Sequence, residues 1–322
     1  MLFQLSLCFI GIFTSYLISG YAIEHLTTTF GKDIFTFNLV MILTPSVCNW
    51  IFGKILIFSS DENIEDDPIP RTFYFLCSLF QMCSMACSNS ALAYISYPTQ
   101  LIMKSSKPIV ILGSGLICLS KGIHHPSRIV STLVIVFGVM GFMHQQYSMK
   151  DSSTKDSDVK FFNHVFGWML VIVSLIFDSL LGVIQDKRRL THVLNTNFMI
   201  YRINMYSCAI LITGIIFTSE FVAFFKFFTA NPSVVLFLLL IGVTAAIGQC
   251  FILYTVTHFG PLTCSIITNF RKFVQIFLSV ALFQHALSPQ MGVFVMVVFL
   301  GLMLDVWSQF KYRPKAKSSL IV

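Results

Sequence analysis

The sequence predicts an all-α membrane protein with ten transmembrane helices arranged as two inverted five-helix repeats. Three observations lead to this prediction. The 322 residues are 56% hydrophobic and only 11% charged, which is too apolar for a soluble domain of this length. The apolar residues fall into stretches of about 20, the length that crosses a bilayer. Landmark residues of the first half also recur in the second half at a constant offset.

The predicted spans follow one another through short loops and leave no room for a separate soluble domain. They cover residues 2–23, 35–58, 72–95, 98–119, 127–147, 163–185, 197–218, 233–257, 261–284 and 289–310. The first span has no basic segment before its apolar run and is too long for the core of a signal peptide. We therefore expect it to remain in the mature protein as a helix.

An offset of about half the chain brings similar residues into register. The landmarks that superpose are Pro98 on Pro261, Pro126 on Pro289 and Gly138 on Gly301, with "VIVFGVMGF" over "VVFLGLML". If each half holds five helices, an odd number, the second half enters the membrane upside down relative to the first. The predicted organisation is a first repeat at 1–147, a polar linker at 148–162, a second repeat at 163–310 and a basic tail at 311–322.

The basic residues predict the orientation of the bundle. With both termini in the cytosol, the cytosolic segments hold eleven Lys and Arg residues and the lumenal segments hold five. The positive-inside rule therefore favours cytosolic termini. The same topology accounts for the net charge of +7, because no basic stripe interleaved with aromatic residues points to nucleic acid.

Five cations fall inside predicted spans, where each costs about 2.5–3.5 kcal/mol at a helix centre. They are Lys104, Lys107, Arg202, Arg271 and Lys272. At 1.5 Å per residue, Lys107 lies about 13 Å from the lumenal end of its helix. Arg271 lies about 15 Å from the cytosolic end of a helix that runs the opposite way. The two halves therefore carry cations to the middle of the membrane, the depth at which repeat-built transporters hold their substrates.

These cations predict an anionic ligand. The alternative is that they pair with buried carboxylates, but only Asp178 and Asp305 are acids of the predicted spans. Arg202 lies near the start of its helix, so reaching the interface is its favoured role. The predicted substrate-binding set combines the other four cations with polar neighbours: Lys104, Lys107, Arg271, Lys272, Asn269, Gln275, Gln249 and Tyr97.

Catalytic and metal sites are not predicted. His124 and His125 are adjacent in a short loop and lack a third ligand or a nucleophile. The nine cysteines form no C-x-x-C pair and lie mostly in apolar stretches, as small buried side chains do. We therefore expect no enzyme activity, no metal and no cofactor.

Three segments resemble the nucleotide-sugar transporters of solute carrier family 35, subfamily B, in their UDP-galactose transporter-like branch. They are "ALAYISYPTQLIMKSSKP" (91–108), "FDSLLGVIQDK" (177–187) and "FGPLTCSIITNFRKFVQIFLSVALF" (259–283). The resemblance implies ten helices in two inverted halves, as in the drug/metabolite transporter superfamily. It further implies an antiporter that exchanges a cytosolic nucleotide sugar for a lumenal nucleoside monophosphate, with the four cations on the phosphates.

Several questions stay open at this stage. Phosphate-binding cations do not identify the sugar, so ATP/ADP, PAPS or UDP-N-acetylglucosamine are alternative cargoes, and a membrane-embedded transferase is a further alternative. The resemblance favours the endoplasmic reticulum membrane. However, Lys315 and Lys317 in "KYRPKAKSSLIV" are too far from the end for a dilysine signal, which keeps the Golgi as the alternative. Association into a homo-oligomer is also left open.

Overall fold

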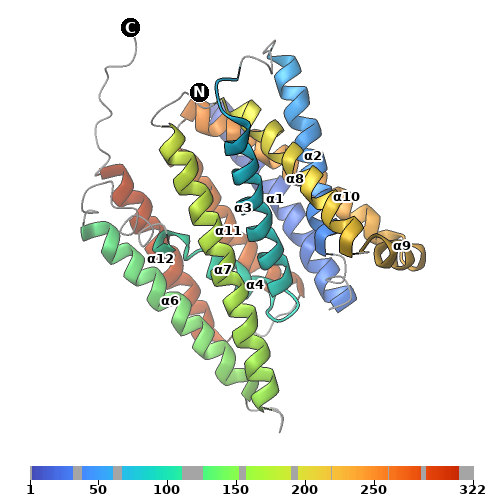
Figure 1. Ribbon diagram of the computed structural model, residues 1–322. Helices are drawn as coiled ribbons and strands as arrows, with labels where there is room; N and C mark the ends of the chain where they lie inside the picture. Colours follow the sequence, from blue (N-terminus) through green and yellow to red (C-terminus); the bar gives the residue numbers. More distant parts are fainter. Residues whose placement is uncertain are drawn as a thin grey trace.

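The computed structural model describes residues 2–31, 38–60, 67–110, 126–151, 157–189, 195–218, 220–259, 261–283 and 288–311. Over these residues the regular structure is helical throughout (Figure 1). The helices are α1 (Leu2–Phe30), α2 (Asn38–Ser59), α3 (Arg71–Ala91), α4 (Tyr97–Lys104), α6 (Pro126–Asp151), α7 (Ser157–Arg189), α8 (Thr196–Thr218), α9 (Glu220–Ala230), α10 (Ser233–Phe259), α11 (Pro261–Phe283) and α12 (Pro289–Lys311).

Eight of the described helices are long and apolar enough to cross a membrane, namely α1, α2, α6, α7, α8, α10, α11 and α12. This confirms the prediction of a multi-pass, all-helical membrane protein. The helices α3 and α4, which cover the predicted third and fourth spans, are not among the eight. The count of ten spans therefore stays a prediction.

The fourth predicted span is not one continuous helix, which corrects the sequence-based expectation. Helix α4 ends at Lys104, a turn occupies Ser105 and Ser106, and residues 107–110 are helical again. Pro108 explains the break, because proline has no N–H to donate to the carbonyl of Lys104 and its ring clashes with that carbonyl. The remainder of the predicted span, 111–119, lies outside the described residues. Lys104 and Lys107 therefore flank a turn, which is one way that membrane proteins expose backbone at a binding site.

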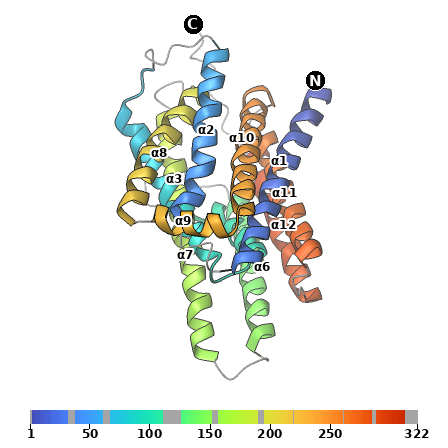
Figure 2. The same ribbon diagram turned by 90° about the vertical axis from the view of Figure 1, so that its right-hand side faces the viewer.

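Other element boundaries also differ from the prediction. Helix α1 continues to Phe30, seven residues beyond the predicted end of the first span. Helices α6 and α7 reach into the predicted linker, of which 152–156 lie outside the described residues. The short helix α9 was not predicted, and Figure 2 shows it running across the direction of the long helices. The tail 312–322 and the His124–His125 pair lie outside the described residues.

The helices pack in pairs that relate the two halves of the chain. Helix α1 packs on α10 as α7 packs on α3, and α2 packs on α10 as α8 packs on α3. The pairs α2 with α8 and α6 with α12 each join two helices that would occupy equivalent positions in the two predicted repeats. Figure 1 shows α6 and α12 on one side of the bundle and α1, α2, α8 and α10 on the other. It also shows α1 beginning and α12 ending at the same end, here called the terminal end.

The interior and the outer surface of the bundle are both apolar. One core cluster joins α4, α6, α7, α11 and α12 and includes Ile102, Phe142 and Ile276. A second joins α1, α2, α8 and α10 around Leu26 and Leu238. Large apolar side chains also cover the outside of the bundle: Phe58, Phe137, Ile216, Phe217, Leu236 and Val293 are more than half exposed. A helix that is apolar on all sides fits a bilayer, because lipid covers its outer face.

Candidate functional site

The cations predicted at mid-membrane lie near one another in the folded chain. Lys104 ends helix α4, and Lys107 begins the helical segment after the turn. Helix α11, which packs on α4, carries Arg271 and Lys272. Lys272 lies within electrostatic range of the other three. All four side chains are partly shielded from solvent. We call these four residues the cation cluster.

The cation cluster has no direct carboxylate partner among the described residues. Within the described part of the chain, none of its four side chains has a carboxylate oxygen within 4.0 Å. The acid that acts on Lys104 and Lys272 is Asp178 of α7, whose Oδ1 accepts a hydrogen bond of 2.7 Å from the Ser84 hydroxyl. One carboxylate that lies more than 4.0 Å from the four cations leaves an excess of positive charge. Buried charge in excess needs a counter-ion.

Arg271 is held by aromatic and amide groups. Its guanidinium carbon lies 4.2 Å from the centre of the Tyr16 ring, a cation–π contact between α11 and α1. Its Nη1 donates to Gln275 Oε1 at 3.3 Å, and the Tyr16 hydroxyl donates to Gln249 Oε1 at 3.3 Å. Gln249 and Gln275, both predicted from the sequence, therefore each accept a hydrogen bond from one member of the Tyr16–Arg271 pair. Because α11 packs on both α1 and α10, the three helices hold this arrangement together.

Polar contacts continue along α11 away from the terminal end. The Gln275 amide donates to the Tyr97 hydroxyl at 2.7 Å, and the Ser279 hydroxyl donates to Glu24 Oε1. These two contacts tie α11 to α4 and to α1 respectively. Tyr97 thus lies in the same network as Arg271, whereas Asn269 faces a small cavity with Lys272 and Ser105.

Sequence reasoning missed two residues of this region, Tyr16 and Glu24. Glu24 was placed outside the first span, but α1 continues past it and its exposed fraction is 1%. The available signal was the absence of any Gly or Pro between Tyr21 and Phe30, which would have extended the predicted helix. Glu24 is a third acid of the spans beside Asp178 and Asp305, and the excess of cations in the cluster still holds.

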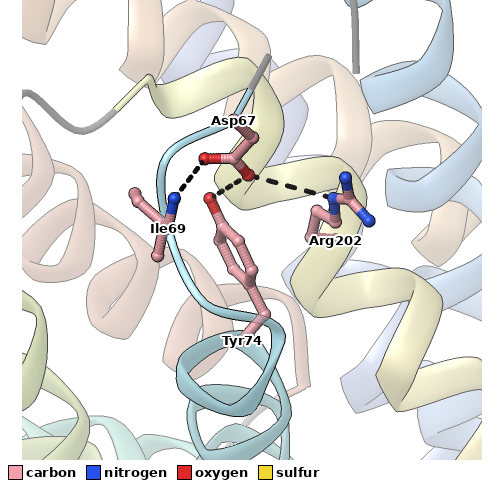
Figure 3. A network of polar contacts seen from close by, with 4 residues as sticks. All are labelled: Asp67, Ile69, Tyr74 and Arg202. Carbon is pink, nitrogen blue, oxygen red and sulfur yellow. Dashed lines mark hydrogen bonds and ion pairs between the residues drawn. The ribbon is translucent and has the colours of Figure 1, made fainter. Parts of the chain in front are cut away.

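The fifth intramembrane cation, Arg202, has a structural partner. Its Nε lies 3.9 Å from Asp67 Oδ2, and the same oxygen accepts a 2.7 Å hydrogen bond from the Tyr74 hydroxyl (Figure 3). Asp67 Oδ1 accepts from the backbone N–H of Ile69 at 3.1 Å. The network joins α8 to the segment that leads into α3. Arg202 is therefore a packing residue, separate from the cation cluster.

A larger cleft lies at the terminal end, and none of the four cluster residues lines it. It encloses about 620 Å³ between α1, α2, α8 and α10. Polar side chains at the helix ends line it, including Gln4, Ser60, Asn197 and His258, with apolar side chains deeper in. Toward the other end α2 and α10 approach closely, because Gly242 lets the backbone of α10 reach Thr44 and Cys48. The two helices therefore diverge toward the terminal end.

Comparison with known proteins identifies the family. A model of the UAA transporter family matches residues 4–309. The chain belongs to the UAA transporter family. Solute carrier family 35 member B1 from Bos taurus is 38% identical over 94% of this chain and 92% of its own length. The Danio rerio protein is 37% identical over 97% and 93%, and the Drosophila melanogaster homolog is 30% identical over 92% and 88%.

These relatives confirm the resemblance to the nucleotide-sugar transporters of solute carrier family 35, subfamily B. They are named as solute carriers, which supports the prediction of a carrier in this UAA transporter family and not of an enzyme. A solved crystal structure matches with a TM-score of 0.53 at 14% identity, covering 95% of this chain and 98% of the other. That likeness concerns the fold alone.

Proposed function

We propose that this protein is a nucleotide-sugar antiporter of the UDP-galactose or UDP-glucose type. It exchanges a cytosolic nucleotide sugar for a lumenal nucleoside monophosphate across the endoplasmic reticulum membrane, with the Golgi membrane as the alternative. The observation that carries the proposal is the cation cluster, because four cations from two halves of the chain gather with no carboxylate of the described segments within 4.0 Å. A diphosphate supplies the concentrated negative charge that such a cluster needs.

Each polar side chain of the site has a role in this proposal. Lys104, Lys107, Arg271 and Lys272 hold the phosphates. Gln249, Gln275, Tyr97 and Asn269 offer amide and hydroxyl groups to the sugar and the base. Attraction between these cations and a phosphate is much stronger in the membrane interior than in water. Amide and hydroxyl contacts then supply selectivity, because an unmatched polar group in such a site is costly.

The paired packing of the two halves supports a mechanism of alternating access. A carrier of two inverted repeats presents its site to either side by rocking one set of helices against the other. The matched pairs of helices support this organisation. The Tyr97–Gln275 and Glu24–Ser279 contacts join α1, α4 and α11 on one side of Arg271, while α2 and α10 diverge at the terminal end. We propose that this arrangement is the form of the carrier that is closed toward the lumen and open toward the cytosol. The substrate binds to this form and neutralises the cations before the cytosolic side closes.

The test is counterflow in proteoliposomes with purified protein. Lys107→Ala and Arg271→Ala should each lower nucleotide exchange by about 10- to 100-fold, because a hydrogen bond to a charged group contributes about 1.5–3 kcal/mol. Lys54→Ala is the matched control, since Lys54 is exposed at the end of α2 and outside the cluster. Exchange at the wild-type rate in either cluster variant contradicts the phosphate role.

The same vesicles identify the cargo. A panel of UDP-galactose, UDP-glucose, UDP-N-acetylglucosamine, PAPS, ATP and ADP should be offered in competition with one radiolabelled substrate. Strong competition by UDP-hexoses alone supports the proposed cargo. If ATP and ADP compete and the UDP-hexoses do not, the cargo is an adenine nucleotide and not a UDP-hexose. The proposed exchange mechanism would still hold. Product formation without countertransport would point to a transferase instead.

A further inference from the structure

Asp178 is an acid within the membrane-spanning part of the chain to which the proposed mechanism assigns no role. It lies in the middle of α7, and its Oδ1 accepts a 2.7 Å hydrogen bond from the hydroxyl of Ser84 on α3. The same hydroxyl lies 3.0 Å from the Ser174 hydroxyl, one helical turn before Asp178. Because α3 and α7 pack along their lengths, the carboxylate is fixed in position by a neighbouring helix.

Asp178 is close to the cation cluster but does not bond to it. Its helix α7 packs on α4, and α4, α7 and α11 share one core cluster, which places Asp178 within electrostatic range of Lys104 and Lys272 from the two halves of the chain. Among the residues that the structure describes, no carboxylate oxygen lies within 4.0 Å of a side chain of the cluster. Asp178 is therefore near enough to attract these lysines and far enough to leave their ammonium groups available to a ligand.

An acid at this depth needs a reason to be there. A carboxylate in the middle of a transmembrane helix costs several kcal/mol unless it faces a cavity or a cation. A serine hydroxyl alone is only a partial compensation, because one hydrogen bond to a charged group contributes about 1.5–3 kcal/mol net. The lysines supply the remaining stabilisation in the empty carrier. When a phosphate occupies the cluster, the same carboxylate instead repels it.

We infer that Asp178 is an internal counter-ion of the cation cluster, which partly replaces the anionic substrate in the empty carrier and competes with it for the lysines. The inference rests on the proposed function and adds two consequences. Asp178 weakens substrate binding, and it lets a fraction of empty carriers reorient because their site is less positive. Asp178 is thus a positioning residue that acts through the lysines. It sets the ratio of nucleotide exchange to one-way nucleotide efflux, in which the carrier returns empty.

The test compares Asp178→Asn with wild type in the same proteoliposomes. Asparagine keeps the shape and an oxygen that can accept from Ser84, and it removes the charge. Because the repulsion on the substrate is lost, the KM for the nucleotide should fall about 5- to 30-fold. One-way efflux into buffer without nucleotide should fall relative to exchange, because an empty site with more positive charge closes less readily.

Three further variants keep the outcome interpretable. Asp178→Glu retains the charge and should keep KM within about threefold of wild type. Asp178→Leu, which a membrane helix accommodates, should change KM in the same direction as Asp178→Asn. Asp305→Asn is the matched control, because Asp305 is a buried acid of α12 that contacts Ser131 instead of the cluster.

The results separate this inference from the proposed function. An unchanged or higher KM in both Asp178→Asn and Asp178→Leu, with wild-type exchange intact, overturns the counter-ion role and leaves the carrier assignment standing. Equal efflux-to-exchange ratios in wild type and Asp178→Asn would also overturn it. Absence of nucleotide exchange in the wild type itself would instead reject the proposed function.

Discussion

Gly138 of α6 and Gly301 of α12 make reciprocal contacts across the interface between their two helices. A Cβ on Gly138 would lie 3.0 Å from the backbone nitrogen of Val298 and 3.2 Å from the carbonyl oxygen of Phe294. A Cβ on Gly301 would lie 3.0 Å from the nitrogen of Ile135 and 3.3 Å from the carbonyl oxygen of Ser131.

The partners of these glycines are equivalent in the two halves. The sequence offset that places Gly138 on Gly301 also places Ile135 on Val298 and Ser131 on Phe294. A local two-fold relation therefore runs through the contact between α6 and α12. It supports the proposal that the chain consists of two inverted repeats, because a two-fold axis in the membrane plane relates such repeats.

The reciprocal contact predicts equal effects of two substitutions. Gly138→Ala and Gly301→Ala should each destabilise the folded protein by about 1–3 kcal/mol, because the added methyl meets backbone that cannot move aside alone. Gly292→Ala in the same helix α12 is the control. Apart from its chain neighbours and its own helix backbone, no atom of the described residues lies within 4 Å of its added Cβ, so it should be neutral or stabilise by up to about 1 kcal/mol. Thermal unfolding in detergent measures all three, and a loss in only one of the two glycine variants would argue against the two-fold relation.

The Asp67 network predicts a stability effect without a transport effect. Asp67→Ala should cost about 2–4 kcal/mol, because it leaves the buried Tyr74 hydroxyl and the Arg202 guanidinium without their shared acceptor. Tyr74→Phe removes one of these contacts and should cost about 1 kcal/mol. Melting temperature and the KM of exchange are measured together on each variant. A KM that changes by more than about tenfold would place this network in the transport path.

The contact between Arg271 and Tyr16 predicts that the ring matters more than the hydroxyl. Tyr16→Leu should reduce exchange by about 30-fold, because a desolvated cation–π contact contributes about 2 kcal/mol. Tyr16→Phe keeps the ring and loses only the 3.3 Å bond to Gln249, so its rate should stay within about fivefold of wild type. The measurement is initial-rate counterflow at saturating and limiting nucleotide. Equal losses in both variants would assign the role to the hydroxyl.

Glu220, outside the spanning helices, predicts a pH dependence of stability. Its Oε2 accepts a 2.9 Å hydrogen bond from the backbone N–H of Leu39 at the start of α2, and burial raises the pKa of its carboxyl above the usual value. A carboxyl with a raised pKa in the folded state binds its proton more tightly there than in the unfolded chain. Its contribution to stability is complete below the unfolded pKa of about 4.3 and is lost as the pH rises through the folded pKa.

The Glu220→Gln variant isolates this effect, because glutamine resembles the protonated acid. Melting temperatures of wild type and variant should converge at low pH, and the wild type should fall below the variant as the pH rises above about 4.3. A difference that stays constant from pH 4 to pH 7 would show that the carboxyl does not titrate differently in the folded protein.

Much of the architecture was predictable because it depends on local composition. Membrane insertion follows from runs of apolar residues, and α1, α2, α8 and α10 were predicted to within a few residues of their bounds except at the far end of α1. Helix α9 was missed because its apolar run from Phe221 to Phe228 is too short to span a bilayer. Pro108 indicates some disturbance of the helix after Lys104. A proline in an apolar run does not by itself show whether a membrane helix kinks or ends, so the turn was not predicted.

The sequence alone determined the membrane class and the family, since these depend on hydrophobicity and on local motifs. It also predicted similar depths for Lys107 and Arg271 from the distance along each helix, and that placement stays a prediction. Only the tertiary structure decided which groups touch. The ring of Tyr16 on Arg271, the carboxylate of Asp178 near Lys104 and the pairing of Arg202 with Asp67 each join helices that are far apart in the chain. Such contacts depend on how each helix is rotated about its axis and crosses its neighbours. Packing among all the helices fixes that rotation, and no local stretch of sequence encodes it.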